Sequence, residues 1–196
     1  MSGVLLIPIA ILLSYLLGSV PSGLWLGRYW RGVDIRTQGS HNIGATNTLR
    51  VLGKPLGITA LLCDLAKGIL AVLLIARLHP WPELPLICGL AAILGHTFSV
   101  FLRFKGGKGV ATSAGVFLGL APLPTGLAVC SFLIAFGVTR MVSVGSLVAA
   151  VVLGIAVFLF PVSLTIRIAA VIVVLLVIFK HRSNIHRIMR KEELKF

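Results

Sequence analysis

The chain contains very few acidic residues. Its 196 residues include five Asp and Glu together, against eighteen Lys and Arg. No HExxH motif, His/Cys cluster or carboxylate-rich segment with metal-ligand spacing occurs, so the usual zinc and carboxylate metal sites are excluded. No HxxxxD box follows any histidine, and Asp34 and Asp64 are the only aspartates. Chemistry that needs a strong protein base is therefore disfavoured, and we expect neither a metal ion nor a cofactor.

Cysteine is also scarce. Cys63, Cys88 and Cys130 each lie within an apolar run, their number is odd, and no CxxC spacing occurs. We expect free thiols that pack as small hydrophobic side chains.

The first apolar run has no basic segment before it, and Pro21-Ser22-Gly23 is a poor cleavage site. This run is therefore expected to be a retained helix rather than a signal peptide.

Polar residues are too few for a soluble surface. The chain is 58% hydrophobic and 12% charged, with a mean hydropathy of +1.06, which indicates a single integral membrane domain over 1–196. Runs of spanning length cover 4–27, 55–77, 84–102, 143–160 and 162–180. The run 109–139 is too long for one span and contains Pro122-Leu123-Pro124, so two short helices, 109–122 and 125–139, are expected. The sequence thus predicts an all-α protein with seven transmembrane helices.

The net charge of +13 is distributed asymmetrically. With seven spans, every basic residue except Lys67, Arg77 and Arg167 falls on one side of the membrane. The positive-inside rule then places the N-terminus outside and the C-terminus in the cytosol. Because the basic residues lie between and after apolar runs, they indicate contact with anionic membrane lipid and anionic substrates, and no nucleic-acid partner is expected.

Residues 101–112 read FLRFKGGKGVAT, a glycine-rich basic loop between apolar segments. Lys105 and Lys108 supply positive charge, and Gly106 and Gly107 permit close approach of backbone N–H groups to an anion, which suits a phosphate. The loop is not a Walker A motif, because no glycine stands at position 102 and Gly109 follows Lys108. The alternative is an ordinary cytosolic turn with snorkelling lysines.

Three other segments carry polar side chains on the same side. DIRTQGSHNIGATNTLR (34–50) offers hydroxyl, amide and guanidinium donors to an oxyanion, or else its Asn and Ser cap the next helix. In RMVSVGS (140–146), Ser143 and Ser146 share a helical face, although Ser143 is also a natural N-cap. In HRSNIHR (181–187), His181 and Asn184 are three residues apart and suit a polyol phosphate, and the alternative is a basic tail on lipid head groups.

Asp64 and Lys67 lie inside an apolar run with i, i+3 spacing. An unpaired charge in the bilayer is costly, so a pair is expected, either as interior structure or reaching toward the site. His96 and Ser99 stand near the end of another span, where interhelical hydrogen bonds are expected.

In order and spacing, five segments of the chain resemble those of the bacterial membrane-integral acyl-phosphate:glycerol-3-phosphate acyltransferases. These segments are GSHNIGATNTLR, DLAKG, GHTFSVFLRFKGGKGVAT, RMVSVGS and HRSNIHR. The resemblance covers essentially the whole chain. It implies transfer of a fatty acyl group from acyl phosphate to glycerol 3-phosphate, which gives 1-acyl-glycerol 3-phosphate (lysophosphatidic acid) and inorganic phosphate. It also implies seven helices, a cytosolic active site and a functional partnership with an acyl carrier protein:phosphate acyltransferase.

The resemblance also implies roles for individual residues. Those around the donor's phosphate and carbonyl would be Ser40, Thr46, Asn47 and Lys108, and those holding glycerol 3-phosphate would be Arg50, Lys108, Ser146, His181 and Asn184. Ser143 is a further candidate, whereas His41 is assigned no role. With no His–Asp pair, the donor's own phosphate is expected to take the acceptor proton, while Lys108, Ser40 and Asn47 contribute to catalysis by orientation and charge. The rival interpretations are an organophosphate transporter, which would need a path across both leaflets, and a scaffold that binds anionic lipids.

Overall fold

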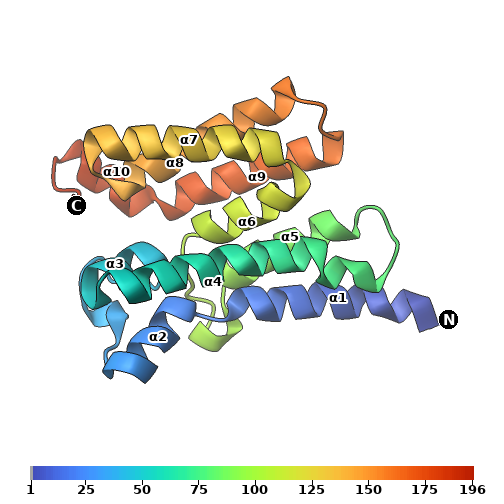
Figure 1. Cartoon of the computed structure of the whole chain (residues 1–196), viewed down its shortest axis with the longest axis horizontal. Helices are drawn as coiled ribbons and strands as arrows, with labels where there is room; N and C mark the ends of the chain where they lie inside the picture. The colour runs from blue at the N-terminus through green and yellow to red at the C-terminus, as the bar shows by residue number, and fades with distance from the viewer. Residues whose placement is uncertain (1) are drawn as a thin grey trace. The chain divides into compact units, whose positions relative to one another are not determined.

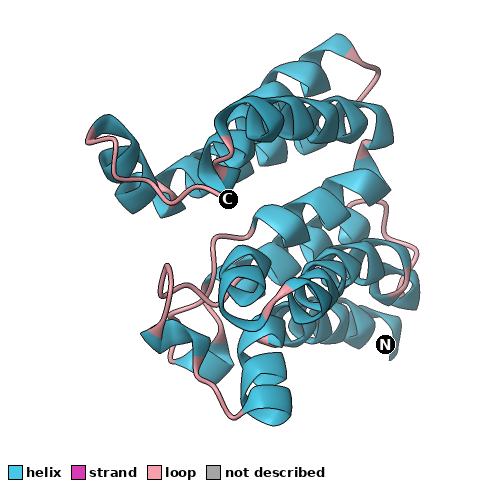
Figure 2. Ribbon diagram, turned by 60° about the vertical axis from the view of Figure 1, so that its left-hand side comes forward, coloured by secondary structure: helices cyan, strands magenta, loops and turns pink. Residues whose placement is uncertain are grey.

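The computed structural model describes residues 2–196, and within them every regular element is helical (Figures 1 and 2). The α-helices are α1 (Ser2–Ser19), α2 (Ser22–Arg31), α3 (Ala45–Leu52), α4 (Lys54–Leu73), α5 (Leu84–Thr97), α6 (Val110–Leu120), α7 (Pro122–Thr139), α8 (Val142–Leu159), α9 (Leu164–Lys180) and α10 (Arg182–Met189). Short 3₁₀ helices η1 (Ile35–Thr37), η2 (Ile75–Leu78) and η3 (Val100–Leu102) lie between them. The predicted all-α class is confirmed.

The chain forms two compact units, which are described separately. Unit 1 extends to Gly119 and unit 2 is Leu120–Phe196. In unit 1, α1 packs against α5 and α4 packs against α3 and α5; in unit 2, α8 packs against α7 and α9. No sequence feature marks a boundary near Gly119, and a single domain over 1–196 stays a prediction.

Proline positions determine several helix boundaries. Pro21 separates α1 from α2, which meet at 47°, so the predicted span 4–27 is two helices rather than one. The break in 109–139 comes at Ala121, and Pro122 is the first residue of α7. This is the position that proline favours, since its missing N–H has no partner in the first turn. Two helices were therefore predicted correctly, but the second begins three residues earlier than expected.

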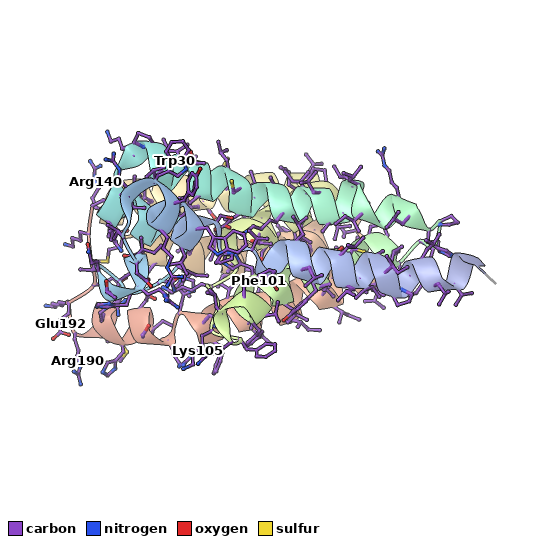
Figure 3. All side chains as sticks on the ribbon, turned by 90° about the horizontal axis from the view of Figure 1, so that it is seen from below. Trp30, Phe101, Lys105, Arg140, Arg190 and Glu192 are labelled. Atoms are coloured by element: carbon purple, nitrogen blue, oxygen red, sulfur yellow. The ribbon has the colours of Figure 1, made fainter. Side chains whose placement is uncertain are left out.

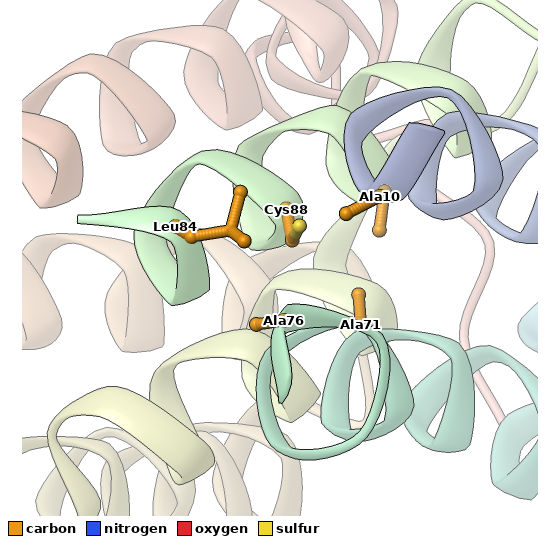
Figure 4. Packing of buried hydrophobic residues seen from close by; sticks show 6 residues of the cluster. Ala10, Ala71, Ala76, Leu84 and Cys88 are labelled. Carbon is orange, nitrogen blue, oxygen red and sulfur yellow. The ribbon is translucent and has the colours of Figure 1, made fainter. Parts of the chain in front are cut away.

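Small residues bring the helices of unit 1 into close contact. A Cβ at Gly95 of α5 would lie 2.1 Å from the carbonyl oxygen of Tyr15, and one at Gly115 of α6 would lie 2.1 Å from that of Leu65. Ala10, Ala71, Leu84 and Cys88 form part of a fully buried cluster between α1, α4 and α5 (Figure 4). Close backbone approach through small residues is typical of helix packing in membranes.

Long apolar helices agree with an integral membrane protein. Within the described residues, four helical stretches are long and apolar enough to cross a membrane: Lys54–Leu78, Leu84–Leu102, Pro122–Thr139 and Val142–Leu159. The bent pairs α1–α2 and α9–α10 raise this number to six if each is one span. The remaining apolar helix, α6, has 11 residues, about 16 Å at 1.5 Å per residue, so the seventh predicted span stays a prediction.

Candidate active site

Asn47 stabilises the polar loop that precedes α3 through side-chain hydrogen bonds. Its Oδ1 accepts from the Ser40 N–H at 2.8 Å, and its Nδ2 donates to the carbonyls of Ile35, Gln38 and Asn42 at 2.7, 3.1 and 2.9 Å. The side chain is 1% exposed. An amide that offers both an acceptor and donors is the group best able to satisfy such a tight loop. The structure thus gives Asn47 a positioning role, while its predicted part in catalysis stays a prediction.

The expected capping of α3 by Asn or Ser takes a different form. Gly44 is the N-cap and makes no side-chain cap, while Asn42 Oδ1 accepts from the Gly44 N–H at 3.0 Å. The loop is therefore held mainly by Asn47, the third residue of α3, rather than by a side chain at the N-cap.

Asp34 forms ion pairs with two arginines at the start of this loop. Arg28 Nη2 and Arg36 Nη2 donate to its carboxylate at 2.8 and 2.6 Å, and the Arg36 N–H donates at 3.0 Å. The hydrogen bond from the Arg36 side chain holds the pKa of Asp34 well below its usual range, although partial burial opposes this. One carboxylate against two guanidinium groups leaves the cluster with a net positive charge.

The glycine-rich loop lies along the end of α5. The N–H groups of Gly106 and Gly107 donate to the carbonyls of Thr97 and His96 at 3.2 and 3.0 Å. A Cβ at Gly106 would lie 2.1 Å from the His96 carbonyl oxygen, and one at Gly107 would lie 2.3 Å from His96 Nε2. The structural reason for these glycines is therefore close packing against α5, and both of their N–H groups donate to its carbonyls. Contact of Gly106 and Gly107 with substrate stays a prediction.

A buried polar network lies next to the glycine-rich loop and involves Asp64, Lys67 and His96. Lys67 Nζ lies 2.6 Å from Asp64 Oδ1 and also donates to the Val20 carbonyl, where α1 ends before α2. His96 Nδ1 lies 3.8 Å from the same carboxylate oxygen. The predicted Asp64–Lys67 pair is confirmed as interior structure, and the His96 ring links it to Gly107. Ser99 Oγ donates to the Ser19 carbonyl at 2.5 Å, which confirms its interhelical bond.

The two polar segments of unit 1 meet at a cavity of about 540 Å³, which we call the basic cavity. The loop before α3 contributes Arg36, His41, Asn42 and Ile43; the segment after α5 contributes Phe101, Leu102, Arg103, Lys105 and Gly106. The sequence motifs predict Lys105 and Gly106 as site residues but not Arg36 and Arg103. Arg103 has a φ of 52°, a turn that no sequence pattern indicated.

The polar side chains of unit 2 converge on Glu193. Its Oε1 accepts from Asn184 Nδ2 at 2.6 Å and its Oε2 from Arg187 Nε at 2.7 Å. Burial raises the pKa of the Glu193 carboxyl, but the hydrogen bonds from Asn184 and Arg187 outweigh burial and lower it. The sequence predicts Ser143 and Asn184 as site residues but not Glu193, because two adjacent acids in a basic tail carry no spacing signal.

The local roles of the serines and of His181 differ from the simplest expectations. The N-cap of α8 is Met141, so the N-cap interpretation of Ser143 is wrong, and its side chain is buried. Ser146 Oγ donates to the Val142 carbonyl at 2.8 Å. His181 is the cap residue between α9 and α10, 2% exposed, with Nδ1 2.8 Å from the Val177 carbonyl. His181 and Asn184 are therefore not exposed on a tail at lipid head groups.

The remaining predicted residues belong to unit 1. Ser40, Thr46, Arg50 and Lys108 are all partly buried, the first in the loop before α3, the next two on α3 and the last between Gly107 and Gly109. The structure thus places Ser40, Thr46, Asn47, Arg50, Lys105, Gly106, Gly107 and Lys108 in unit 1, and Ser143, Ser146, His181 and Asn184 in unit 2.

Comparison with known proteins decides the family. Residues 8–191 match the model of the glycerol-3-phosphate acyltransferase family. The chain belongs to that family. A glycerol-3-phosphate acyltransferase of Trichlorobacter lovleyi is 49% identical over 93% of this chain and 94% of its own length, and one of Fusobacterium nucleatum is 42% identical over 95% and 96%.

A solved structure shows the same fold. The crystal structure of PlsY (YgiH), an integral membrane glycerol 3-phosphate acyltransferase, in its glycerol 3-phosphate form, has a TM-score of 0.91 and 34% identity, covering 97% of this chain and 95% of that one. Its lysophosphatidic acid form has a TM-score of 0.89. This member of the family is therefore a multi-pass integral membrane acyltransferase that acts on glycerol 3-phosphate.

Proposed function

We propose that this acyltransferase takes its acyl group from acyl phosphate and releases lysophosphatidic acid and inorganic phosphate. The observation that carries the proposal is the match over nearly the whole chain to a glycerol 3-phosphate acyltransferase whose solved forms contain glycerol 3-phosphate and lysophosphatidic acid. Acyl phosphate is an activated mixed anhydride, so the chemistry does not require a strong protein acid or base. The near absence of carboxylates in the polar segments agrees with this donor.

The proposed step balances without a cofactor. The 1-hydroxyl oxygen of glycerol 3-phosphate attacks the acyl carbonyl carbon and forms the new ester bond. The bond from that carbon to the phosphate oxygen breaks, phosphate leaves with the electron pair, and it takes the hydroxyl proton. The protein contributes orientation and neutralisation of charge, which are the effects available to a site that holds cations and neutral donors.

Residue roles are proposed from the family motifs. Ser40, Thr46 and Lys108 contact the donor's phosphate and carbonyl, and Asn47 holds the Ser40 N–H in place through the bond at 2.8 Å. Glycerol 3-phosphate is held by Arg50, Lys108, Ser146, His181 and Asn184, with Ser143 beside them. Lys105, Gly106 and Gly107 complete the phosphate-binding loop. Lys108 contacts the phosphates of both substrates and makes the largest single contribution to catalysis.

Topology is part of the same proposal. Seven spans, with the N-terminus outside and the C-terminus in the cytosol, put the polar loops of both units on the cytosolic face of the bacterial plasma (inner) membrane. There the enzyme would receive acyl phosphate from an acyl carrier protein:phosphate acyltransferase. Cysteine labelling of the η2–α5 loop and of the C-terminal tail from each side of sealed vesicles tests this arrangement, and accessibility of the tail from outside would contradict it.

The donor is tested with purified full-length protein in detergent. The protein is given palmitoyl phosphate, palmitoyl-CoA or palmitoyl-acyl carrier protein, each with and without glycerol 3-phosphate. We expect phosphate release that depends on glycerol 3-phosphate with the first donor alone. Turnover with a thioester but not with acyl phosphate would show that the proposed donor is wrong, while the assignment as an acyltransferase would stand.

A further inference from the structure

The basic cavity of unit 1 has a composition that glycerol 3-phosphate alone does not explain. Its cationic side chains are Arg36, Arg103 and Lys105, and no carboxylate lines it. The nearest acid, Asp34, already accepts from Arg28 and Arg36 and stays ionised. A cluster that remains positive after its own acid is paired favours a bound anion.

One wall of the cavity is apolar and continues outward. Phe101 and Leu102 line it, and the Phe101 ring lies 5.7 Å from the ring of Trp25 on α2. Trp25 and Phe101 are 46% and 50% exposed. Phe101 and Lys105 are labelled in Figure 3. A small water-soluble phosphate has no use for an exposed aromatic surface beside its charged site, whereas an amphiphile does.

The same surface carries the residue types that are typical of a membrane interface. Trp25, Tyr29 and Trp30 are exposed on α2, the short helix that follows the apolar α1. Tryptophan and tyrosine gather where the bilayer core meets the head groups. Arginine and lysine beside such a belt lie where anionic lipid phosphates are found.

We propose that the basic cavity binds the head group of an anionic membrane phospholipid, with its phosphate at Arg36, Arg103 and Lys105 and its chains along Phe101 and Trp25. The cavity shares Lys105 and Gly106 with the loop proposed to bind substrate phosphate, and it adds Arg36, Arg103 and Phe101. Lipid binding there goes beyond the proposed function, and its test uses binding alone, so failure of the acyl-phosphate reaction and failure of the lipid site are distinguishable.

The test is native mass spectrometry of the delipidated full-length protein in a non-ionic detergent. Phosphatidylglycerol and phosphatidylcholine with the same chains are titrated separately. We expect adducts with phosphatidylglycerol at lower lipid concentration, weakened by added salt. Equal binding of the two lipids would show that net head-group charge is not recognised and would overturn the proposal.

Variants locate the site. Arg103 has a φ of 52°, a conformation that Asn tolerates, so Arg103→Asn removes the charge and keeps the turn. We expect phosphatidylglycerol affinity to fall about fivefold, as for one basic residue near an anionic surface, and Arg103→Lys to restore it. Arg31→Gln, an exposed arginine of α2 outside the cavity, is the matched control and should bind as the wild type. Wild-type binding by Arg103→Asn would overturn the proposal.

A second variant separates a lipid from a free anion. Phe101→Ala should weaken phosphatidylglycerol binding and leave the binding of inorganic phosphate unchanged. Displacement of the lipid by inorganic phosphate at equal concentration would assign the cavity to a free anion, and displacement by palmitoyl phosphate or lysophosphatidic acid at equal concentration would assign it to the reaction's own amphiphiles. Either result would overturn the membrane-lipid proposal.

Discussion

Asp64 and Lys67 form a fully buried ion pair, with Oδ1 and Nζ 2.6 Å apart and side chains 3% and 5% exposed. Lys67 also donates to the Val20 carbonyl, which lies between α1 and α2 and also accepts from the Ser22 N–H at 3.0 Å. The pair therefore joins the α1–α2 bend to α4, and through His96 it reaches the glycine-rich loop. Its effect on that loop can be tested.

Removing one charge of the pair should destabilise the protein more than removing both charges. Asp64→Leu leaves the Lys67 ammonium buried without its carboxylate, which is expected to destabilise the protein by about 3–5 kcal/mol. Asp64→Leu with Lys67→Met removes both charges of the pair and should lose less stability. Thermal unfolding in detergent compares the two. Equal loss in both variants would mean that the pair does not act as a unit.

Asn47→Ala should loosen the loop before α3. The change removes the acceptor of the Ser40 N–H and the donors to three carbonyls, and groups left unsatisfied cost about 1–3 kcal/mol. We expect faster hydrogen exchange at residues 35–44, with the helices α4 and α5 unchanged. Asn42→Ala, which removes a single bond to Gly44, is the milder control. Unchanged exchange in Asn47→Ala would contradict the positioning role.

Alanine substitutions in the glycine-rich loop should destabilise the protein according to the clash that each new Cβ makes. Gly106→Ala meets a backbone carbonyl at 2.1 Å, so no side-chain rotation relieves it, whereas Gly107→Ala meets the His96 ring at 2.3 Å. We expect both to lower the thermal midpoint and acyl transfer, Gly106→Ala more strongly. Gly137→Ala in α7 meets nothing within 4 Å, and its midpoint should stay level or rise, because Ala is the better helix former. A Gly106→Ala protein as stable as Gly137→Ala would refute the packing argument.

Stability should fall in acid in a way that depends on Glu193. Its pKa is lowered in the folded protein, so its contribution is fully present above the unfolded value and is lost as pH falls through the lower folded value. Below about pH 4 the wild-type midpoint should drop. Glu193→Gln should be less stable than wild type near pH 7, by about 2 kcal/mol, and should show a smaller acid-dependent loss.

The neighbouring acid supplies the control. Glu192 is exposed (Figure 3), and Glu192→Gln should retain the wild-type acid profile. Asp34, whose pKa is also lowered, acts in the same direction in unit 1, so some acid dependence remains in Glu193→Gln. An acid profile identical to wild type in Glu193→Gln would contradict the assigned ion pairing.

The fold class and the polar segments could be predicted because both follow from composition. Long apolar runs have few alternatives in a bilayer, and Pro122 was expected to interrupt one of them. The Asp64–Lys67 pair was equally predictable, because two charges one turn apart in an apolar run must neutralise each other. The bend at Pro21 was missed because the apolar residues continue past it.

The contacts that hold the site were beyond the sequence because they are made between segments. Asn47 was predicted for its chemistry, yet its hydrogen bonds depend on a loop path with left-handed residues at Gly39 and His41. Arg103 reaches the basic cavity only through a left-handed turn after η3. Glu193 finds Asn184 and Arg187 only because the tail folds back, with the Phe196 N–H donating to the Arg140 carbonyl at 2.9 Å.

The most direct test of the account compares wild type and Lys108→Ala in one assay that counts both products. Purified protein is given palmitoyl phosphate and glycerol 3-phosphate, and lysophosphatidic acid and inorganic phosphate are quantified together. The account predicts one phosphate per lysophosphatidic acid in the wild type and a rate about 10²–10³-fold lower in folded Lys108→Ala, as for removal of a group that stabilises developing charge. Phosphate release without lysophosphatidic acid, or near-normal turnover by Lys108→Ala, would contradict it.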